Sequence, residues 1–276
     1  MMNTNEARMT LISSRFGKYL TSYDLLKFFA VVTMIVDHIG FYLFPHVVEL
    51  RIIGRLSSPC WMFLAGFSKS LEVGKNILIA CFLLVLANCV MGTYLLPLNI
   101  LALIIIARLF LKYMGPMVFL RKEFVFYCCL VMAIVALPSY YLIEYSTFGI
   151  MIAFAGYIAR HRGETAFGPV AEKFFLAFVL GFFVLGQTAI FMFSPVYVAA
   201  LCVMFALLGL FLYRFEPKEY LRATARLPAP ALWTLQFCGR YSLEIYVVHV
   251  IILWGVSLYY GTHSAEWLNP PVFYKN

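Results

Sequence analysis

The stretch DLLKFFAVVTMIVDHIGFYLF at residues 24–44 decides the fold class of this chain. It is almost wholly apolar, with Lys27, Asp37 and His38 as the titratable side chains in its interior. A helix that crosses a bilayer needs about 20 mostly apolar residues. Eight further stretches have this character, so the sequence predicts an all-α, polytopic transmembrane bundle of about nine helices, within a range of eight to ten. The predicted spans are 24–44, 51–71, 76–96, 98–114, 124–143, 146–160, 173–193, 195–213 and 231–260, the last being long enough for a broken or tilted helix.

The composition excludes a soluble protein. Of the 276 residues, 63% are hydrophobic and 12% are charged, and the mean hydropathy is +0.89, whereas soluble domains carry about 25% charged residues. We therefore expect a cytoplasmic segment at 1–22, a single transmembrane domain at 23–260 and a short extracytoplasmic tail at 261–276. The net charge of +8 does not indicate nucleic-acid binding, because the basic residues lie between apolar stretches rather than on one face of a soluble fold.

Lysine and arginine are distributed unequally between the two sides of the predicted bundle. Cytoplasmic loops are enriched in these residues, so we expect a cytoplasmic amino terminus and a multi-pass protein of the bacterial inner membrane. Residues 1–22 lack a long apolar core and a cleavage site, so the first span is expected to act as an uncleaved insertion signal. On the side that holds the amino terminus lie 16 of the 21 Lys and Arg residues, namely Arg8, Arg15, Lys18, Lys69, Lys75, Arg108, Lys112, Arg121, Lys122, Arg160, Arg162, Lys173, Arg214, Lys218, Arg222 and Arg226.

Titratable side chains inside the first two predicted spans are candidates for a functional site. An ionisable group in hydrocarbon costs several kcal/mol unless it is paired or faces a cavity. Asp37 and His38 lie in the outer half of the first span, and Lys27 lies on nearly the same helical face near its cytoplasmic end. Arg51 and Arg55 follow at an i, i+4 spacing on the outer side. They suit anion binding or pairing with Asp37, Glu49 or Glu144, and a simple Asp37–Arg55 ion pair that locks the two helices is the structural alternative.

Three further polar residues, Asn99, Glu144 and Tyr145, are expected near the same level of the membrane. Asn99 follows the third predicted span, and Glu144 and Tyr145 precede the sixth. His249 lies in the last span, where a structural histidine bonded to a neighbour is the simpler interpretation. Convergence of polar groups from several helices is typical of a binding site. The cysteines all fall in apolar stretches without zinc-binding spacing, so we expect no metal site.

These motifs resemble the TraX family, which includes the F-type pilin acetylase. The resemblance rests on Asp24-Leu25-Leu26-Lys27, Met34-Ile35-Val36-Asp37-His38-Ile39-Gly40 and Gly54-Arg55-Leu56-Ser57-Ser58-Pro59, with weaker marks at Asn99-Ile100-Leu101 and Glu144-Tyr145. Glu144 stands where the family has Asp, and Ser146 where it has Gly. The closing segment Ser242-Leu243-Glu244-Ile245-Tyr246-Val247-Val248-His249 is similar to that of the wider membrane acyltransferases.

The resemblance implies an acyltransferase that moves acetyl from acetyl-CoA to the amino terminus of a pilin subunit. A neutral histidine is a suitable general base at pH 7, so we expect His38 and Asp37 to be catalytic. Arg51, Arg55, Asn99, Glu144, Tyr145 and His249 are expected to bind substrate, and Lys27 to bind coenzyme A with Lys69 or Arg108. Another envelope acceptor such as a glycan, a proton-coupled transporter, and a non-catalytic assembly partner remain alternatives.

Overall fold

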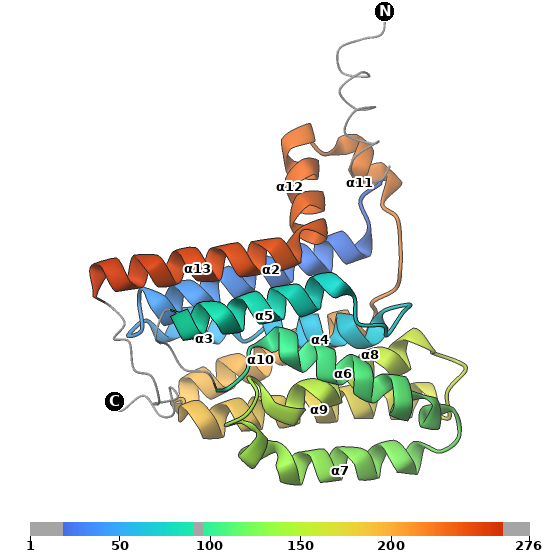
Figure 1. Ribbon diagram of the computed structural model, residues 1–276. Helices are drawn as coiled ribbons and strands as arrows, with labels where there is room; N and C mark the ends of the chain where they lie inside the picture. Colours follow the sequence, from blue (N-terminus) through green and yellow to red (C-terminus); the bar gives the residue numbers. More distant parts are fainter. Residues whose placement is uncertain (1–18, 91–95, 262–276) are drawn as a thin grey trace, which may run out of the picture.

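The computed structural model describes residues 19–90 and 96–261, and within these ranges the chain forms helices, two isolated bridges and no strand (Figure 1). The all-α prediction is confirmed for this part of the chain. Arg8, Arg15, Lys18 and the predicted tail after 261 lie outside the described residues. The helices are α2 (Ser22–Tyr42), α3 (Val48–Gly54), α4 (Ser57–Phe67), α5 (Lys75–Val90), α6 (Ile100–Met114), the 3-10 helix η1 (Gly115–Phe119), α7 (Lys122–Ser139), α8 (Ser146–Arg160), α9 (Pro169–Phe191), α10 (Pro195–Tyr213), α11 (Leu221–Arg226), α12 (Ala229–Arg240) and α13 (Ser242–Tyr260).

Five helical segments are long and apolar enough to cross a membrane: α2, α6 together with η1, α9, α10 and α13. Three shorter apolar helices, α5, α7 and α8, lie among them. In Figure 1 the axes of all these helices run in nearly the same direction. Large apolar side chains are exposed along their flanks, including Phe82 and Ile134, as expected where lipid rather than water is the solvent. The chain is therefore a membrane protein.

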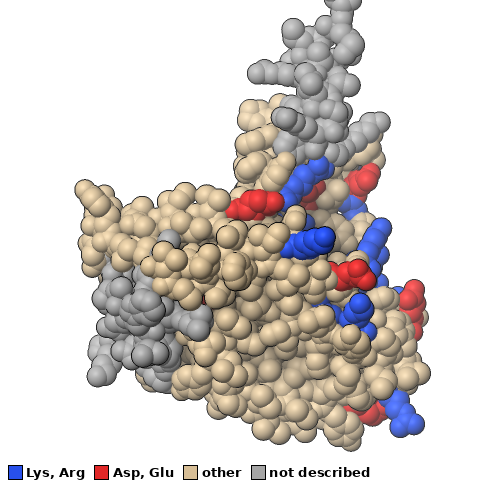
Figure 2. All heavy atoms as spheres, in the orientation of Figure 1, with Lys and Arg blue, Asp and Glu red and all other residues tan. Residues whose placement is uncertain are grey.

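Charged side chains gather at one end of the bundle. Figure 2 shows lysine, arginine and acidic residues along the right-hand edge, while the apolar flank to their left is almost free of charge. This end holds the connections after α4, η1, α8 and α10, with Lys69, Arg121, Arg162 and Lys218 among their residues. We call it the charged end. The opposite end holds the turns after α2, α7 and α9.

The second predicted span, 51–71, is wrong as one continuous helix. The structure has α3 and α4 there, separated at Arg55 and Leu56. Pro59 explains the break, because it lacks the N–H that would bond to the Arg55 carbonyl and is tolerated in the first turn of a new helix. A Cβ atom on Gly54 would collide with Asp37. The glycine thus allows α3 to approach α2 closely at the level of Asp37.

The last predicted span, 231–260, is two helices. α12 ends at Arg240 and α13 begins at Ser242, and α12 crosses the bundle axis at the charged end beside α11 (Figure 1). Gly239 of α12 lies against Asp24 of α2. The predicted possibility of a broken helix is confirmed, and α13 alone continues along the bundle. This placement lays α13 beside α2 and brings its His249 to the level of His38.

The core is centred on α4 and α8, which are buried over most of their lengths. Gly66 of α4 and Gly156 of α8 lie where an added Cβ would collide with the backbone of the other helix. Small residues at such crossings let two backbones approach closely, as in other membrane helix pairs. Phe63 and Phe154 are fully buried beside this contact. The α4–α8 pair thereby fixes the position of the first turn of α4, which lines the site described next.

Candidate functional site

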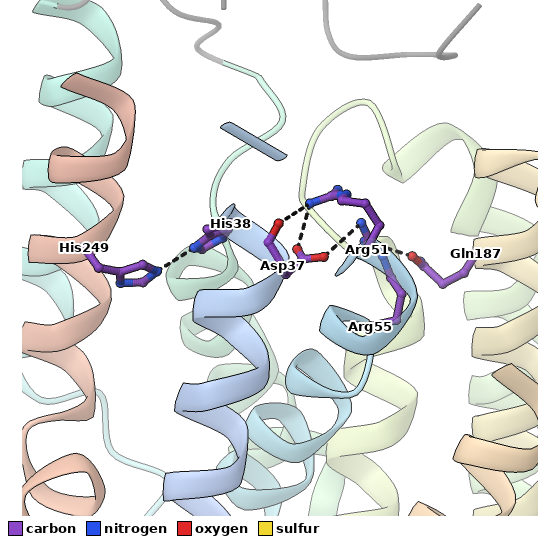
Figure 3. Close-up of polar contacts among 6 residues, drawn as sticks. All are labelled: Asp37, His38, Arg51, Arg55, Gln187 and His249. Atoms are coloured by element: carbon purple, nitrogen blue, oxygen red, sulfur yellow. Dashed lines mark hydrogen bonds and ion pairs between the residues drawn. The ribbon is translucent and has the colours of Figure 1, made fainter. Parts of the chain in front are cut away.

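A pair of histidines from α2 and α13 lies in the interior of the bundle. The Nδ1 atom of His38 is 2.7 Å from Nε2 of His249, and the two rings are stacked with centroids 4.9 Å apart. The other nitrogen of His249, Nδ1, is 2.6 Å from the carbonyl oxygen of Ile245. Figure 3 shows the two rings facing each other across the gap between the helices. His38 and His249, both predicted as site residues, are therefore in direct contact.

The hydrogen bonds assign the tautomers of this pair. A carbonyl oxygen can only accept a hydrogen bond, so Nδ1 of His249 carries a proton and donates a hydrogen bond to the Ile245 carbonyl oxygen. Nε2 of neutral His249 then has a free lone pair and accepts a hydrogen bond from the Nδ1–H of His38. The remaining nitrogen of His38, Nε2, is left with an unprotonated lone pair. This arrangement gives His38 the state that a general base requires, with His249 holding the ring in orientation.

Asp37 forms ion pairs with both arginines and does not hold the His38 ring. Its carboxylate is 3.0 Å from Arg51 Nη1 and 3.5 Å from Arg55 Nη2, and Arg51 also donates to the Asp37 carbonyl at 3.0 Å. In Figure 3 the Asp37 side chain points toward the arginines and His38 points toward α13. The structural alternative of an Asp37–Arg55 pair is thus present, with Arg51 added to it. The Asp37 carboxylate thus contacts the two arginines, while the His38 ring contacts His249.

Arg55 also connects to α9, through a residue that the sequence did not single out. Its Nη1 donates to Oε1 of Gln187 at 3.1 Å, and its guanidinium lies 4.4 Å from the ring centroid of Phe191. Gln187 is only 1% exposed. The sequence signal for Gln187 was an amide side chain inside an apolar helix. This signal is weak, because burying a neutral side chain costs less free energy than burying a charge. Glu49, the other suggested partner, instead accepts a hydrogen bond of 2.6 Å from Tyr197.

Glu144, Tyr145 and Asn99 meet around the start of α6. Glu144 accepts the Ile100 N–H at 3.1 Å, and the Asn99 side-chain oxygen caps the helix by accepting the N–H groups of Leu101 and Ala102. Tyr145 has a left-handed backbone, with φ of 60°, and its ring lies near the Arg55 guanidinium. Burial raises the pKa of the Glu144 carboxyl, in the connection before α8, to about 7. Asn99 therefore shapes the helix end, while Glu144 and Tyr145 line the site itself.

The largest of three cavities in this region opens near the charged end. It has a volume of about 530 Å³, within the range typical of ligand pockets, and is lined by three cations and mostly apolar side chains. The cations are Lys27, Lys69 and Arg108, the three residues proposed from the sequence for coenzyme A. At its deep end it is lined by Met34, Trp61, Ile100 and Tyr246. We call it the large cavity.

Two smaller cavities continue from its deep end. The junction cavity, of about 20 Å³, is lined by Met34, Trp61, Ile100 and Tyr246, shared with the large cavity, and by Asp37, His38, Ser57, Ser58, Glu144 and Tyr145. The arginine cavity, of about 90 Å³, shares Asp37, His38, Glu144 and Tyr145 and adds Arg51, Arg55 and Gln187. Because neighbouring cavities share walls, the three lie in a row. His38 lines both of the smaller ones.

Comparisons with known proteins leave the family of the chain open. No protein family model matches it, and no solved structure matches it. An uncharacterized protein of Rickettsia prowazekii (strain Madrid E) is 34% identical to it over 143 residues, which cover 51% of this chain and 58% of the relative. The match thus spans little more than half the length of that relative.

Proposed function

We propose that this chain is a membrane-embedded acetyltransferase of the TraX type, which moves an acetyl group from acetyl-CoA to an acceptor amine or hydroxyl. The observation that carries the proposal is the position of His38. Its unprotonated Nε2 belongs to a ring that lies between a large cavity with cations at its mouth and a smaller polar cavity beyond it. A base placed where two cavities meet suits a reaction between two substrates that enter from opposite ends.

The charged end is proposed to face the cytoplasm, where acetyl-CoA is found. The positive-inside bias supports this orientation, since the connections at that end carry most of the basic residues. Counting the α3–α4 pair as one crossing, α2, α5, α6, α7, α8, α9, α10 and α13 complete nine crossings of the bacterial inner membrane. With this orientation the amino terminus is cytoplasmic and the chain ends outside.

The large cavity matches the chemistry of coenzyme A. Lys27, Lys69 and Arg108 supply positive charge for phosphate groups, and arginine in particular binds phosphate well. Beyond them the walls are largely apolar, with Leu64, Ile77 and Ile104 among them. A long, narrow pantetheine arm would carry the thioester from the phosphates at the mouth toward the junction cavity. The place of Lys27 in the lining of the large cavity supports its proposed role in donor binding.

In the proposed reaction His38 Nε2 removes the proton of the acceptor as its nitrogen or oxygen attacks the thioester carbon. His249 accepts the hydrogen bond from His38 Nδ1 and keeps Nε2 available. The protonated imidazole can then return the proton to the leaving thiolate. An acyl-enzyme on His38 is the alternative route through the same residues. Asp37, Arg51 and Arg55 hold α2, α3 and α9 together around the acceptor end.

The acceptor is proposed to be the amino terminus of a pilin subunit, or otherwise an amine or hydroxyl of an envelope glycan. It would approach through the arginine cavity, where Arg51, Arg55 and Gln187 offer donors to a polar group. The resemblance to the pilin acetylase favours the peptide. The cavity itself is compatible with either acceptor, since both expose a nucleophile flanked by hydrogen-bond acceptors.

A proton-coupled transporter is the second candidate, because cavities in a row with buried charges beside them are also a feature of transport pathways. The two candidates differ in their products. A transferase leaves acetyl covalently attached to an acceptor, whereas a transporter moves a substrate without any covalent change.

Radiolabelled acetyl-CoA supplied to membranes tests the proposal. Label should appear on a small protein, or on glycan, in membranes that contain the wild-type chain. The His38→Ala variant at matched expression should lose this label by about 10²–10⁴-fold, the usual contribution of a general base. Absence of any His38-dependent label, in membranes known to contain the acceptor, would reject the acetyltransferase and favour transport.

A further inference from the structure

Two hydrogen-bond donors beside His38 have no partner among the described residues. They are the hydroxyl of Ser58 and the indole N–H of Trp61, and both atoms are buried. Ser58 is 1% exposed, and both side chains line the junction cavity together with His38. They are three residues apart in the first two turns of α4, so they lie on the same side of that helix. This is an unusual placement, because buried polar groups in proteins almost always have a partner.

The cost of these unpaired donors indicates that something normally binds there. A buried donor without a partner costs about 1–3 kcal/mol, and two such donors one turn apart double that cost. The junction cavity, of about 20 Å³, has room for roughly one small polar atom group. An apolar residue at either position would avoid the cost, so the donors are expected to serve an oxygen atom that occupies the cavity.

We propose that Ser58 and Trp61 form an oxyanion hole for the acetyl carbonyl. The inference rests on the proposed acetyl transfer and adds two catalytic residues to it. The junction cavity shares Met34, Trp61, Ile100 and Tyr246 with the large cavity, so a thioester delivered from the cations reaches these donors at the deep end. The same cavity contains His38. The carbonyl oxygen and the base thus meet in one small space.

Transfer to an amine acceptor proceeds through a tetrahedral oxyanion. The nitrogen lone pair attacks the thioester carbon and forms a C–N bond, while His38 Nε2 takes one N–H proton. The carbonyl π electrons move to oxygen, and the resulting oxyanion accepts hydrogen bonds from Ser58 Oγ–H and Trp61 Nε1–H. When the carbonyl re-forms, the C–S bond breaks and the thiolate of coenzyme A takes the proton from the His38 imidazolium. A hydroxyl acceptor follows the same sequence with a C–O bond.

The position of these donors in α4 adds to the effect. Ser57 and Ser58 are the first two residues of the helix, where the backbone N–H groups of the first turn have no intrahelical partner. The amino end of an 11-residue helix carries a partial positive charge. Fixed donors and a helix amino terminus stabilise charge that develops in the transition state more than charge in the ground state. The arginines do not line this cavity, and Asp37 already neutralises part of their charge.

Trp61→Phe and Ser58→Ala test this inference, since each removes one donor and keeps most of the side-chain volume. Transfer from radiolabelled acetyl-CoA to the His38-dependent acceptor is measured as kcat and as the KM for acetyl-CoA. Each variant is expected to lose about 10²–10³-fold in kcat, with the KM for acetyl-CoA changed less than about threefold. Trp233→Phe on α12, where Trp233 stacks on Phe237, is the matched control and should retain wild-type kcat.

The outcomes separate this inference from the proposed function. Wild-type transfer with unchanged kcat in both variants would overturn the oxyanion hole and leave the acetyltransferase standing. A raised KM at unchanged kcat would also overturn it, because the donors would then serve ground-state binding. If the wild type itself transfers no acetyl group, the proposed function fails and the oxyanion hole fails with it. Size-exclusion profiles that match the wild type exclude misfolding as the cause of a lost kcat.

Discussion

Asp37 and His38 are adjacent in sequence and belong to different parts of the site. Neighbouring residues on a helix point about 100° apart, so Asp37 turns toward Arg51 on α3 while His38 turns toward His249 on α13 (Figure 3). Asp37 links α2 to Arg51 and Arg55 through ion pairs, and His38 carries the proposed chemistry. Variants at these two positions should therefore fail in different ways.

The orienting role of His249 is testable with two substitutions. His249→Leu removes the acceptor for His38 Nδ1–H, so the ring loses its fixed orientation and kcat should fall by about 100-fold, near the lower range for loss of a general base. His249→Gln keeps an oxygen that can accept the same hydrogen bond and should retain most of the activity. Acetyl transfer at saturating acetyl-CoA measures both. Equal activity in the two variants would mean that the hydrogen bond does not position His38.

Asp37→Asn should lower the stability of the folded protein more than it changes the function of His38 as a base. Removing the carboxylate leaves two guanidinium groups buried without their counter-charge, which costs about 3–5 kcal/mol. The expected result is a clear drop of Tm in detergent. Glu216→Gln is the control, because the Glu216–Lys218 pair, 2.8 Å apart, is exposed and exposed ion pairs contribute little to stability. Similar Tm values for the two variants would contradict a structural role for Asp37.

At the scale of elements, close helix approach and helix breaks place the site. Gly54 lets α3 approach Asp37. Pro59 marks the break between α3 and α4, so that Ser58 and Trp61 lie in the first two turns of α4. Apolar stretches in the sequence predicted the helices, because an apolar stretch of about 20 residues is long enough to cross a bilayer as a helix. They did not predict the break at Arg55, since both sides of it are equally apolar and only Pro59 marks the boundary.

The α4–α8 crossing gives a prediction about packing. Gly156→Ala would place a Cβ atom against the Phe63 carbonyl of α4, and the backbones would have to separate at a cost of about 1–3 kcal/mol. Gly181→Ala on α9 has open space around it and should be neutral or stabilise by up to about 1 kcal/mol. Thermal unfolding in detergent compares them. A Gly156→Ala protein as stable as the Gly181→Ala protein would show that the helices do not approach as described.

Across the whole molecule, charged side chains gather at the charged end (Figure 2), and the row of cavities runs from there past His38 to Arg51 and Arg55. The sequence offered an Asp37–Arg55 ion pair as one alternative, because an ionisable group in hydrocarbon is costly unless it is paired. It singled out His249 in the last span, but the direct contact of His249 with His38 joins residues 211 positions apart. Ser58, Trp61 and Gln187 were not predicted, because neutral polar side chains are common in membrane helices and only their neighbours distinguish them.

The proposed orientation is testable with reporters that are active only outside the cytoplasm. A fusion after Gly163, in the connection between α8 and α9, should be inactive, because this loop is at the charged end. A fusion after Phe193, just beyond α9, should be active. Activity at Gly163 together with inactivity at Phe193 would invert the topology and place the large cavity on the outside.

Sided membrane vesicles test the central claim most directly, that acetyl passes from a donor at the charged end to an acceptor by way of His38. Radiolabelled acetyl-CoA, which does not cross membranes, is added to inverted vesicles and to right-side-out vesicles that contain either the wild-type chain or His38→Ala. Covalent label is expected only in inverted vesicles with the wild-type chain. Equal labelling in both orientations, or labelling that persists in His38→Ala, would contradict it.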